Sequence, residues 1–444
     1  MPYPAWQRGE LPWDLSIFPS PSWAHLLPPF PALERPLHLA LPCIGLDGVS
    51  HGLAALSVPF QVVYAFDTLG CLRQPLATIH GAHAATFNLG PREGDILLAD
   101  VRSWDRVDAV VCGPPCQPDS NIGLRLHAAD PRAAVLNKVT EIIADQGRKG
   151  AFFFIAELVP GAFANHKKKS LDQSAEVVSS GMEECAYAAW LRDLRPRAPM
   201  FNLVVWKLNA ATYLPQNRVR HFVVGTNRVF LPQAPIAPPS PSAPPLRLED
   251  VLVTGPELPR DQEAGLSPAK LSDLRVLIES SKARVGWTSQ GPPFWLTLPL
   301  DRDMEKQWAM RCRVDGLIET LRAGDEFKWI VQVGREPRFS RCLHPVERLT
   351  LQGFPTSLAK HFSKRELLLL TGNAFSVPAT AAVMQQLCQA LWEHGFLRAH
   401  QLPQQLEDLQ AARRDLRRAR AQELRLETLS EHIRAQALRR RLEV

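Results

Sequence analysis

The strongest constraint on the fold of this 444-residue chain is a series of short apolar runs that alternate with helix-like segments. Each run has the length of a buried strand and is bounded by turn-forming or acidic residues. The clearest runs cover residues 37–41, 60–66, 107–112 and 151–156, and a weaker run covers 96–99. Strands that alternate with helices predict an α/β fold with a mostly parallel sheet and helices on both faces.

The later part of the chain predicts an end to this sheet and then a separate unit. Residues 203–206 and 221–225 are apolar and flank residues 215–220, which predicts an antiparallel hairpin that finishes the sheet. Residues 232–245 are dense in proline and are typical of a linker. The stretch 246–340 shows no strand–helix alternation, so we expect a second, smaller domain there.

Composition sets limits on partners and compartment. The chain has 51 Lys and Arg against 45 Asp and Glu, which is compatible with a polyanionic partner but does not establish one. Eight cysteines without a Cys-x-x-Cys pair argue against a disulfide scaffold or a structural zinc site, and favour a reducing compartment. We expect no secretory signal, and no apolar run of the roughly 20 residues that a membrane span needs.

One cysteine stands out as a candidate nucleophile. The predicted strand 107–112 stops abruptly at Gly113-Pro114-Pro115, which would present Cys116 at the carboxyl edge of the sheet, where open α/β folds bind their ligands. Taken alone, Cys116 could equally be a small buried residue that closes a turn. The segments that accompany it decide between these interpretations.

In chain order, these segments resemble the motifs of the cytosine-5 DNA methyltransferases across roughly residues 37–395. The matching segments are Gly45-Leu46-Asp47-Gly48 with Ser50-His51-Gly52-Leu53, Asp67 at the end of a strand, Gly94-Asp95-Ile96, Gly113-Pro114-Pro115-Cys116-Gln117, Glu157-Leu158-Val159, Gln216-Asn217-Arg218-Val219-Arg220, residues 341–355, and Thr371-Gly372-Asn373-Ala374. The resemblance implies a Rossmann-like methyltransferase domain that uses S-adenosylmethionine and acts on double-stranded DNA.

The resemblance also implies roles for individual residues. Cys116 would add to C6 of cytosine, and Glu157, kept protonated, would relieve the negative charge at N3. Arg218 and Arg220 alternate along a predicted strand, so both would leave one face and donate to the base O2 and the neighbouring phosphate. The expected substrate-binding residues are Gln117, Ser120 and Gln216. The expected cofactor-binding residues are Cys43, Gly45, Gly48, Asp67, Asp95, Ile96, Pro115, Asn373 and Ala374.

Several positions depart from the family pattern. Cys43 stands where the family has an aromatic residue, Leu158 where it has Asn, and Asp119 where Phe is usual. Asp47 replaces the middle glycine of the first loop, which would put a carboxylate near the carboxylate of the cofactor. We therefore expect Asp47→Gly to tighten S-adenosylmethionine binding.

The sequence thus predicts an active or weakly active DNA cytosine-5 methyltransferase that lifts its target base out of the duplex. Two alternatives remain open. One is methylation of transfer RNA, although the Cys-Phe-Thr signature of that branch is absent; the other is a catalytically silent DNA-binding relative.

The predicted domain organisation follows from the same resemblance. It comprises an irregular Pro/Trp-rich arm (1–36), a catalytic and cofactor-binding domain (37–231), a linker and target-recognition domain (232–340), a return segment that completes the catalytic domain (341–398) and a basic helical tail (399–444). We expect a monomer, with the tail available for association, located with the DNA in a nucleus or nucleoid.

Overall fold

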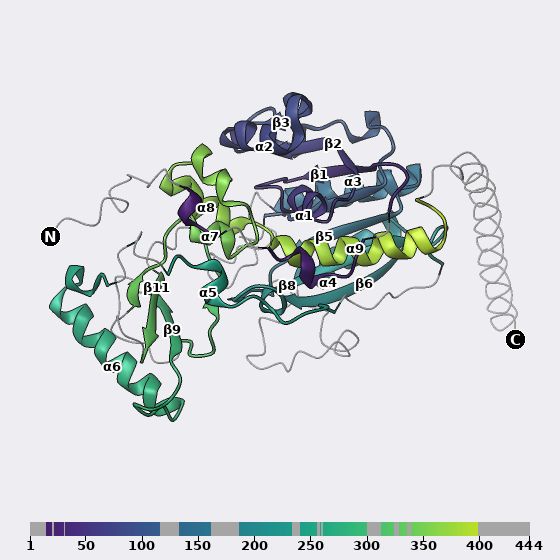
Figure 1. Ribbon diagram of the computed structural model, residues 1–444. Helices are drawn as coiled ribbons and strands as arrows, with labels where there is room; N and C mark the ends of the chain where they lie inside the picture. The colour runs from purple at the N-terminus through teal and green to yellow at the C-terminus, as the bar shows by residue number, and fades with distance from the viewer. Residues whose placement is uncertain are drawn as a thin grey trace, which may run out of the picture.

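A computed structural model of the chain describes residues 15–19, 22–30, 32–115, 133–160, 186–232, 240–254, 258, 261–299, 312–323, 328–334 and 339–397. All the predicted apolar runs except 96–99 form strands of one seven-stranded sheet, in the order β3-β2-β1-β4-β5-β8-β6 (Figure 1). The strands are β1 (Leu37–Pro42), β2 (Phe60–Asp67), β3 (Asn88–Leu89), β4 (Ala109–Cys112), β5 (Phe153–Leu158), β6 (Phe201–Asn209) and β8 (Val219–Asn227). β3, β2, β1, β4 and β5 are parallel, whereas β8 pairs antiparallel with both β5 and β6. This confirms the α/β fold with a terminal antiparallel hairpin.

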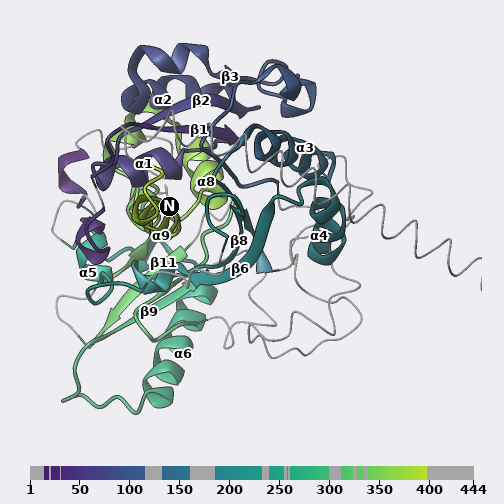
Figure 2. The ribbon, with the colours of Figure 1, turned by 90° about the vertical axis from the view of Figure 1, so that its right-hand side faces the viewer.

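Helices cover both faces of the sheet because side chains alternate along each strand. On β1, Leu39 and Leu41 join the apolar cluster that includes α1 and α9, while Ala40 joins the cluster that includes α3 and α4. Figure 2 shows these two helix pairs on opposite sides of the strands. Their bounds are α1 (Gly48–Ala55), α9 (Val377–Glu393), α3 (Ala133–Lys149) and α4 (Ala186–Arg197), and the short α2 (Arg73–His80) lies beyond β2.

One stretch of the chain is long and apolar enough to be compared with a membrane span. Lys364–Glu393, which contains α8 (Lys364–Asn373) and α9, could cross a membrane by length and composition, so the expectation that no run is long enough was wrong. However, 83% of its most apolar part is buried inside the protein. The apolar character of this stretch is accounted for by the core that it forms.

The third predicted strand was also wrong. Ile96–Leu98 forms a 3-10 turn instead, since the Asp95 carboxylate accepts a hydrogen bond from the Leu97 N–H at 3.0 Å and caps the turn. The strand that pairs in parallel with β2 at this edge of the sheet is instead the two-residue β3.

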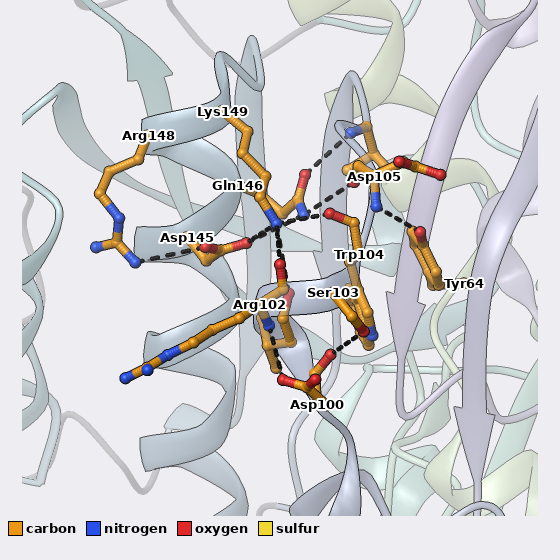
Figure 3. Close-up of polar contacts among 12 residues, drawn as sticks. Tyr64, Asp100, Arg102, Ser103, Trp104, Asp105, Asp145, Gln146, Arg148 and Lys149 are labelled. Atoms are coloured by element: carbon orange, nitrogen blue, oxygen red, sulfur yellow. Dashed lines mark hydrogen bonds and ion pairs between the residues drawn. The ribbon is translucent and has the colours of Figure 1, made fainter.

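The segment that follows this turn is fastened to the end of α3 (Figure 3). Lys149 Nζ donates to the carbonyl oxygens of Trp104 at 2.6 Å and Arg102 at 3.1 Å, and the Gln146 amide donates to the Asp105 carbonyl at 3.1 Å. The Trp104 ring stacks on Tyr64 with the ring centroids 4.4 Å apart. These contacts fix the Trp104 ring against β2.

A second, smaller unit follows the linker. It consists of an antiparallel sheet in the order β12-β11-β9, packed on α6 (Pro268–Arg284). The strands are β9 (Phe294–Pro299), β11 (Lys328–Val333) and β12 (Phe339–Cys342). Because β12 runs through the predicted boundary at residue 340, this unit ends slightly later than expected.

Short elements join the two units. β10 (Ile318–Glu319) pairs in parallel with β7 (Gln216–Asn217), and α5 (Leu248–Val251) and α7 (Glu347–Thr350) lie between the small sheet and the large domain. The described part of the N-terminal arm contains two 3-10 turns, Leu15–Ile17 and Ala24–Leu26, and it is held in place. Trp23 is buried, and its indole N–H donates to the Gly353 carbonyl at 3.0 Å.

Candidate active site

A cavity of about 420 Å³ opens at the carboxyl ends of β1, β2, β4 and β5. This is the edge of an open α/β sheet where ligands bind, and the volume lies within the range of roughly 300–1,000 Å³ that is typical of small-molecule sites. The end of α8 and the β7–β8 segment complete its wall. The lining residues include Phe66, Asp67, Thr68, Leu69, Gly113, Pro114, Glu157, Val159, Arg218, Arg220, Leu369, Leu370 and Gly372.

The structure brings together all but one of the residues predicted to bind the cofactor. Those that line the cavity are Cys43, Gly45, Asp67, Asp95, Ile96, Pro115, Asn373 and Ala374. The exception is Gly48, which does not line it. A Cβ atom at Gly48 would lie 3.0 Å from Cβ of Phe375, so this glycine serves close packing beneath α1.

Asp67 connects the segments that follow β1 and β2 through hydrogen bonds. Its carboxylate accepts hydrogen bonds from the Gly45 N–H at 2.9 Å and the Leu69 N–H at 3.0 Å. Burial raises the pKa of Asp67, and these two backbone hydrogen bonds oppose that rise. Burial also raises the pKa of the neighbouring Cys43 thiol to about 12, with a further contribution from Asp67. Cys43 is therefore a neutral wall residue.

Asp47 does not face the cavity, which corrects the expectation for this position. Its side chain turns inward and is almost fully buried, where one oxygen accepts from the Ser50 N–H at 2.9 Å and the other lies 2.6 Å from Nε2 of His80. The carboxylate is thus not placed to repel a bound carboxylate. Like-charge repulsion therefore gives no ground for tighter S-adenosylmethionine binding in Asp47→Gly.

Glu157 and Arg220 are neighbouring charged residues of the cavity wall. Oε1 of Glu157, near the end of β5, lies 3.4 Å from Nε of Arg220 on the adjacent β8. Burial raises the pKa of Glu157, although the positive charges of Arg220 and Arg218 act in the opposite direction. The site can therefore present a protonated carboxyl group beside a guanidinium.

Arg218 is placed differently from the prediction. It is buried, and its guanidinium donates to the carbonyl oxygens of Leu321 at 3.2 Å, Gly372 at 3.4 Å and Ala374 at 2.6 Å. Its three hydrogen bonds therefore hold backbone, two of them at residues of the cavity wall, and the expectation that Arg218 matches Arg220 in binding the base is revised.

Gln216, which was predicted to bind substrate, is also structural. Its side chain is fully buried, does not line the cavity, and donates to the Leu351 carbonyl at 3.3 Å. Gln216 therefore lies outside the cavity, although it is close to Arg220 in the sequence.

Cys116, Gln117, Asp119 and Ser120 lie outside the described residues. The residue before them, Pro115, lines the cavity.

Sequence reasoning missed Phe66. This ring lines the cavity and stacks on Trp104 with the centroids 5.5 Å apart. The signal was available, because Phe66 directly precedes Asp67 in a chain that lacks the family's aromatic residue at position 43.

Comparisons with known proteins agree with this geometry. The C-5 cytosine-specific DNA methylase family matches residues 43–389. The type II methyltransferase M.NlaX of Neisseria lactamica is 24% identical over 343 residues, covering 77% of this chain and 95% of that protein. The type II methyltransferase M1.ScrFI of Lactococcus lactis subsp. cremoris is 26% identical over 312 residues, covering 70% of this chain and 69% of that protein.

A solved structure shows the same fold. It is described as a DNA modification methyltransferase encoded within a prophage of E. coli, with a TM-score of 0.50 and 16% identity, covering 80% of this chain and 99% of that one.

Proposed function

Because this chain belongs to the C-5 cytosine-specific DNA methylase family, which uses S-adenosylmethionine to methylate C5 of cytosine in DNA, we propose that Cys116, Glu157 and Arg220 perform that transfer here. The observation that carries the proposal is the position of Glu157 and Arg220 in one cavity with Pro115 and Asp67. The groups proposed to bind the donor and the base thereby line one cavity, and Pro115 in its wall directly precedes the proposed nucleophile along the chain.

The cavity fits S-adenosylmethionine. Phe66, Ile96 and Leu370 offer apolar surface for an adenine ring, and Asp95 is available to its amino group. The Asp67 carboxylate has acceptor capacity beyond its two backbone hydrogen bonds, which suits ribose hydroxyl groups. When bound, this cofactor supplies an electrophilic methyl group.

The protein's own residues would prepare the cytosine to accept that group. The Cys116 thiolate adds to C6, which makes C5 enamine-like and nucleophilic. Charge that develops on the ring is relieved when the protonated Glu157 donates to N3, while Arg220 donates to the base O2. After transfer, loss of the C5 proton and departure of the Cys116 sulfur restore the aromatic ring and the free enzyme.

This chemistry cannot reach a stacked base, so the cytosine would rotate out of a double-stranded DNA substrate. The unit of β9, β11, β12 and α6 follows the catalytic strands and is the proposed target-recognition domain. We further propose that the protein acts as a monomer associated with the DNA, in a nucleus or nucleoid. Light scattering on the free protein would test the oligomeric state.

Mechanism-based trapping is the direct test. The protein is incubated with S-adenosylmethionine and a duplex that carries 5-fluorocytosine, whose fluorine blocks the final elimination. We expect a covalent complex that survives denaturation, and no such complex with Cys116→Ala. An identical duplex containing cytosine is the matched control.

Two other outcomes would point to the alternatives. Methyl transfer to transfer RNA but not to duplex DNA in a parallel assay would identify an RNA methyltransferase. Retained DNA affinity without trapping or methyl transfer on either substrate would identify a catalytically silent relative.

A further inference from the structure

The turn between β1 and α1 adopts a conformation that is costly for its sequence. Cys43, Gly45 and Asp47 all have positive φ angles, of 64°, 54° and 57°. For a residue with a Cβ atom this left-handed conformation costs roughly 1–2 kcal/mol, and only glycine adopts it without penalty. Asp47 stands where the family pattern has a glycine. Something in this chain must therefore offset the cost at Asp47.

Two contacts of the Asp47 carboxylate supply that compensation. One oxygen accepts from the Ser50 N–H and caps α1, since Asp47 is the N-cap residue of this helix. The other pairs with Nε2 of His80 on α2, at 2.6 Å, with side-chain exposures of 0% and 4%. The pair is thus desolvated, and its loss would leave an uncompensated carboxylate in the interior.

The surroundings of the pair show that His80 is its specific partner. The His80 ring packs edge-on against Phe60 and Phe87, with centroids 6.0 Å and 4.9 Å away. Burial lowers the pKa of the nearby His51 to about 4, which keeps that ring neutral at ordinary pH. His51 therefore contributes no positive charge to hold Asp47.

The turn that this pair holds forms part of the cofactor cavity. Gly45 and Leu46, directly before Asp47, line the cavity, and Gly45 donates its N–H to Asp67. A shift at Asp47 would move these backbone atoms, because the turn is only a few residues long. His80 itself does not line the cavity, so its effect on the cofactor must act through Asp47.

We propose that Asp47 and His80 form a buried latch that holds the turn of residues 43–48 in its cofactor-binding shape, which makes His80 a positioning residue for S-adenosylmethionine. The inference rests on the proposed function of the cavity. When position 47 is glycine, the turn adopts its positive φ angle without a steric penalty. When position 47 is Asp, the Asp47–His80 pair offsets that penalty. His80 is consequently needed only while Asp47 is present.

A double-mutant cycle tests this dependence. His80→Phe keeps an aromatic ring among Phe60 and Phe87 but removes the hydrogen-bond donor. We expect it to weaken S-adenosylmethionine binding by roughly tenfold or more in calorimetric titration, which corresponds to about 1.4 kcal/mol. In the Asp47→Gly background the same substitution should change the affinity by less than about threefold, since a glycine adopts the turn without help.

A conservative variant and a second ligand separate positioning from general damage. His80→Gln presents an amide N–H near the position of Nε2 and should keep the affinity within about threefold of the parent protein. Duplex DNA affinity, measured by fluorescence anisotropy without cofactor, should stay unchanged in every variant. Steady-state kinetics of His80→Phe should show a raised KM for S-adenosylmethionine with kcat and the KM for DNA preserved.

Several results would overturn the latch. One is equal loss of cofactor affinity from His80→Phe in the parent protein and in the Asp47→Gly background; another is a parallel loss of DNA affinity. If His80→Phe fails to fold, the comparison of Asp47→Gly with the double variant still decides, because His80 must be dispensable there. Failure of the proposed function is distinct, since the parent protein would then bind no S-adenosylmethionine at all.

Discussion

The two arginines of the Gln-x-Arg-x-Arg segment should give opposite phenotypes when each is replaced by methionine. Arg218 is buried and donates three hydrogen bonds to backbone carbonyls, whereas Arg220 lies beside Glu157 in the cavity. Methionine preserves much of the side-chain volume and removes the guanidinium. The comparison therefore isolates the polar contribution of each residue.

The magnitude for Arg218 follows from its contacts. Hydrogen bonds from a charged donor contribute about 1.5–3 kcal/mol each, and a buried carbonyl that loses its donor costs about 1–3 kcal/mol. The bonds of 2.6 Å and 3.2 Å are well formed and the bond of 3.4 Å is weaker. We expect Arg218→Met to lower the free energy of unfolding by about 3–5 kcal/mol.

Arg220→Met should lower the free energy of unfolding by only about 1 kcal/mol or less, for an electrostatic reason. Burial raises the pKa of Glu157, so this carboxyl can take up a proton when its neighbour is removed and leave no buried charge. The catalytic effect should be the reverse. Arg220→Met removes a donor to the base and should slow covalent trapping by about 10²–10³-fold.

Urea denaturation followed by tryptophan fluorescence measures the first quantity, and trapping with 5-fluorocytosine DNA at saturating S-adenosylmethionine measures the second. Trapping is done at a temperature where Arg218→Met is folded. The reasoning is refuted if Arg218→Met matches the parent stability within about 1 kcal/mol and abolishes trapping, because Arg218 would then act on the base as the sequence first indicated.

Three further predictions follow from buried groups. Burial raises the pKa of Glu157 above its ordinary value of 4.5, so the protonated form that the reaction needs persists to higher pH and is lost as the pH rises through the raised pKa. Glu157→Gln should lower kcat by about 10²–10⁴-fold in a tritiated methyl-transfer assay and remove this basic limb from the pH–rate profile; an unchanged limb would assign it to another group. Gly372→Ala should weaken cofactor binding in calorimetry, since its Cβ would overlap the backbone of Arg322 and Ala323, and a normal affinity would contradict that packing. Arg341→Met should lower the free energy of unfolding in urea by about 3–5 kcal/mol, because it leaves the buried Glu347 carboxylate without its positively charged partner. Adding Glu347→Gln to this variant should recover part of the lost stability.

The positions of the site residues along the strands could be predicted from sequence. Cys43, Asp67, Gly113 and Glu157 each sit at or near a strand end, and parallel strands bring their carboxyl ends to one edge. Apolar runs and turn residues are local signals, so the sequence displays them directly. The predicted strand at 96–99 failed for an equally local reason, since the capping contact of the Asp95 carboxylate competes with extended backbone.

The directions of the side chains could not be predicted in the same way, because they depend on partners far away in the chain. Asp47 turns inward toward His80, 33 residues later, and Gln216 turns toward Leu351, 135 residues later. Even the strict alternation that predicted a shared face for both arginines did not apply, since Arg218 precedes β8 and only Arg220 lies within it. The family resemblance therefore predicted the positions of the residues at strand ends, but not the side-chain directions of Asp47 and Gln216.

The contacts of Arg218 connect the proposed target-recognition domain to the wall of the cavity. One guanidinium holds the carbonyl oxygens of both Leu321, from the small unit, and Ala374, from the cavity wall. Arg348 repeats the arrangement, as it donates to the Arg322 carbonyl and to the Thr371 hydroxyl. These hydrogen bonds connect the backbone of residues 321–322 to the segment that forms the cavity wall. By linkage, any effect of DNA on cofactor affinity is matched by an equal effect of the cofactor on DNA affinity.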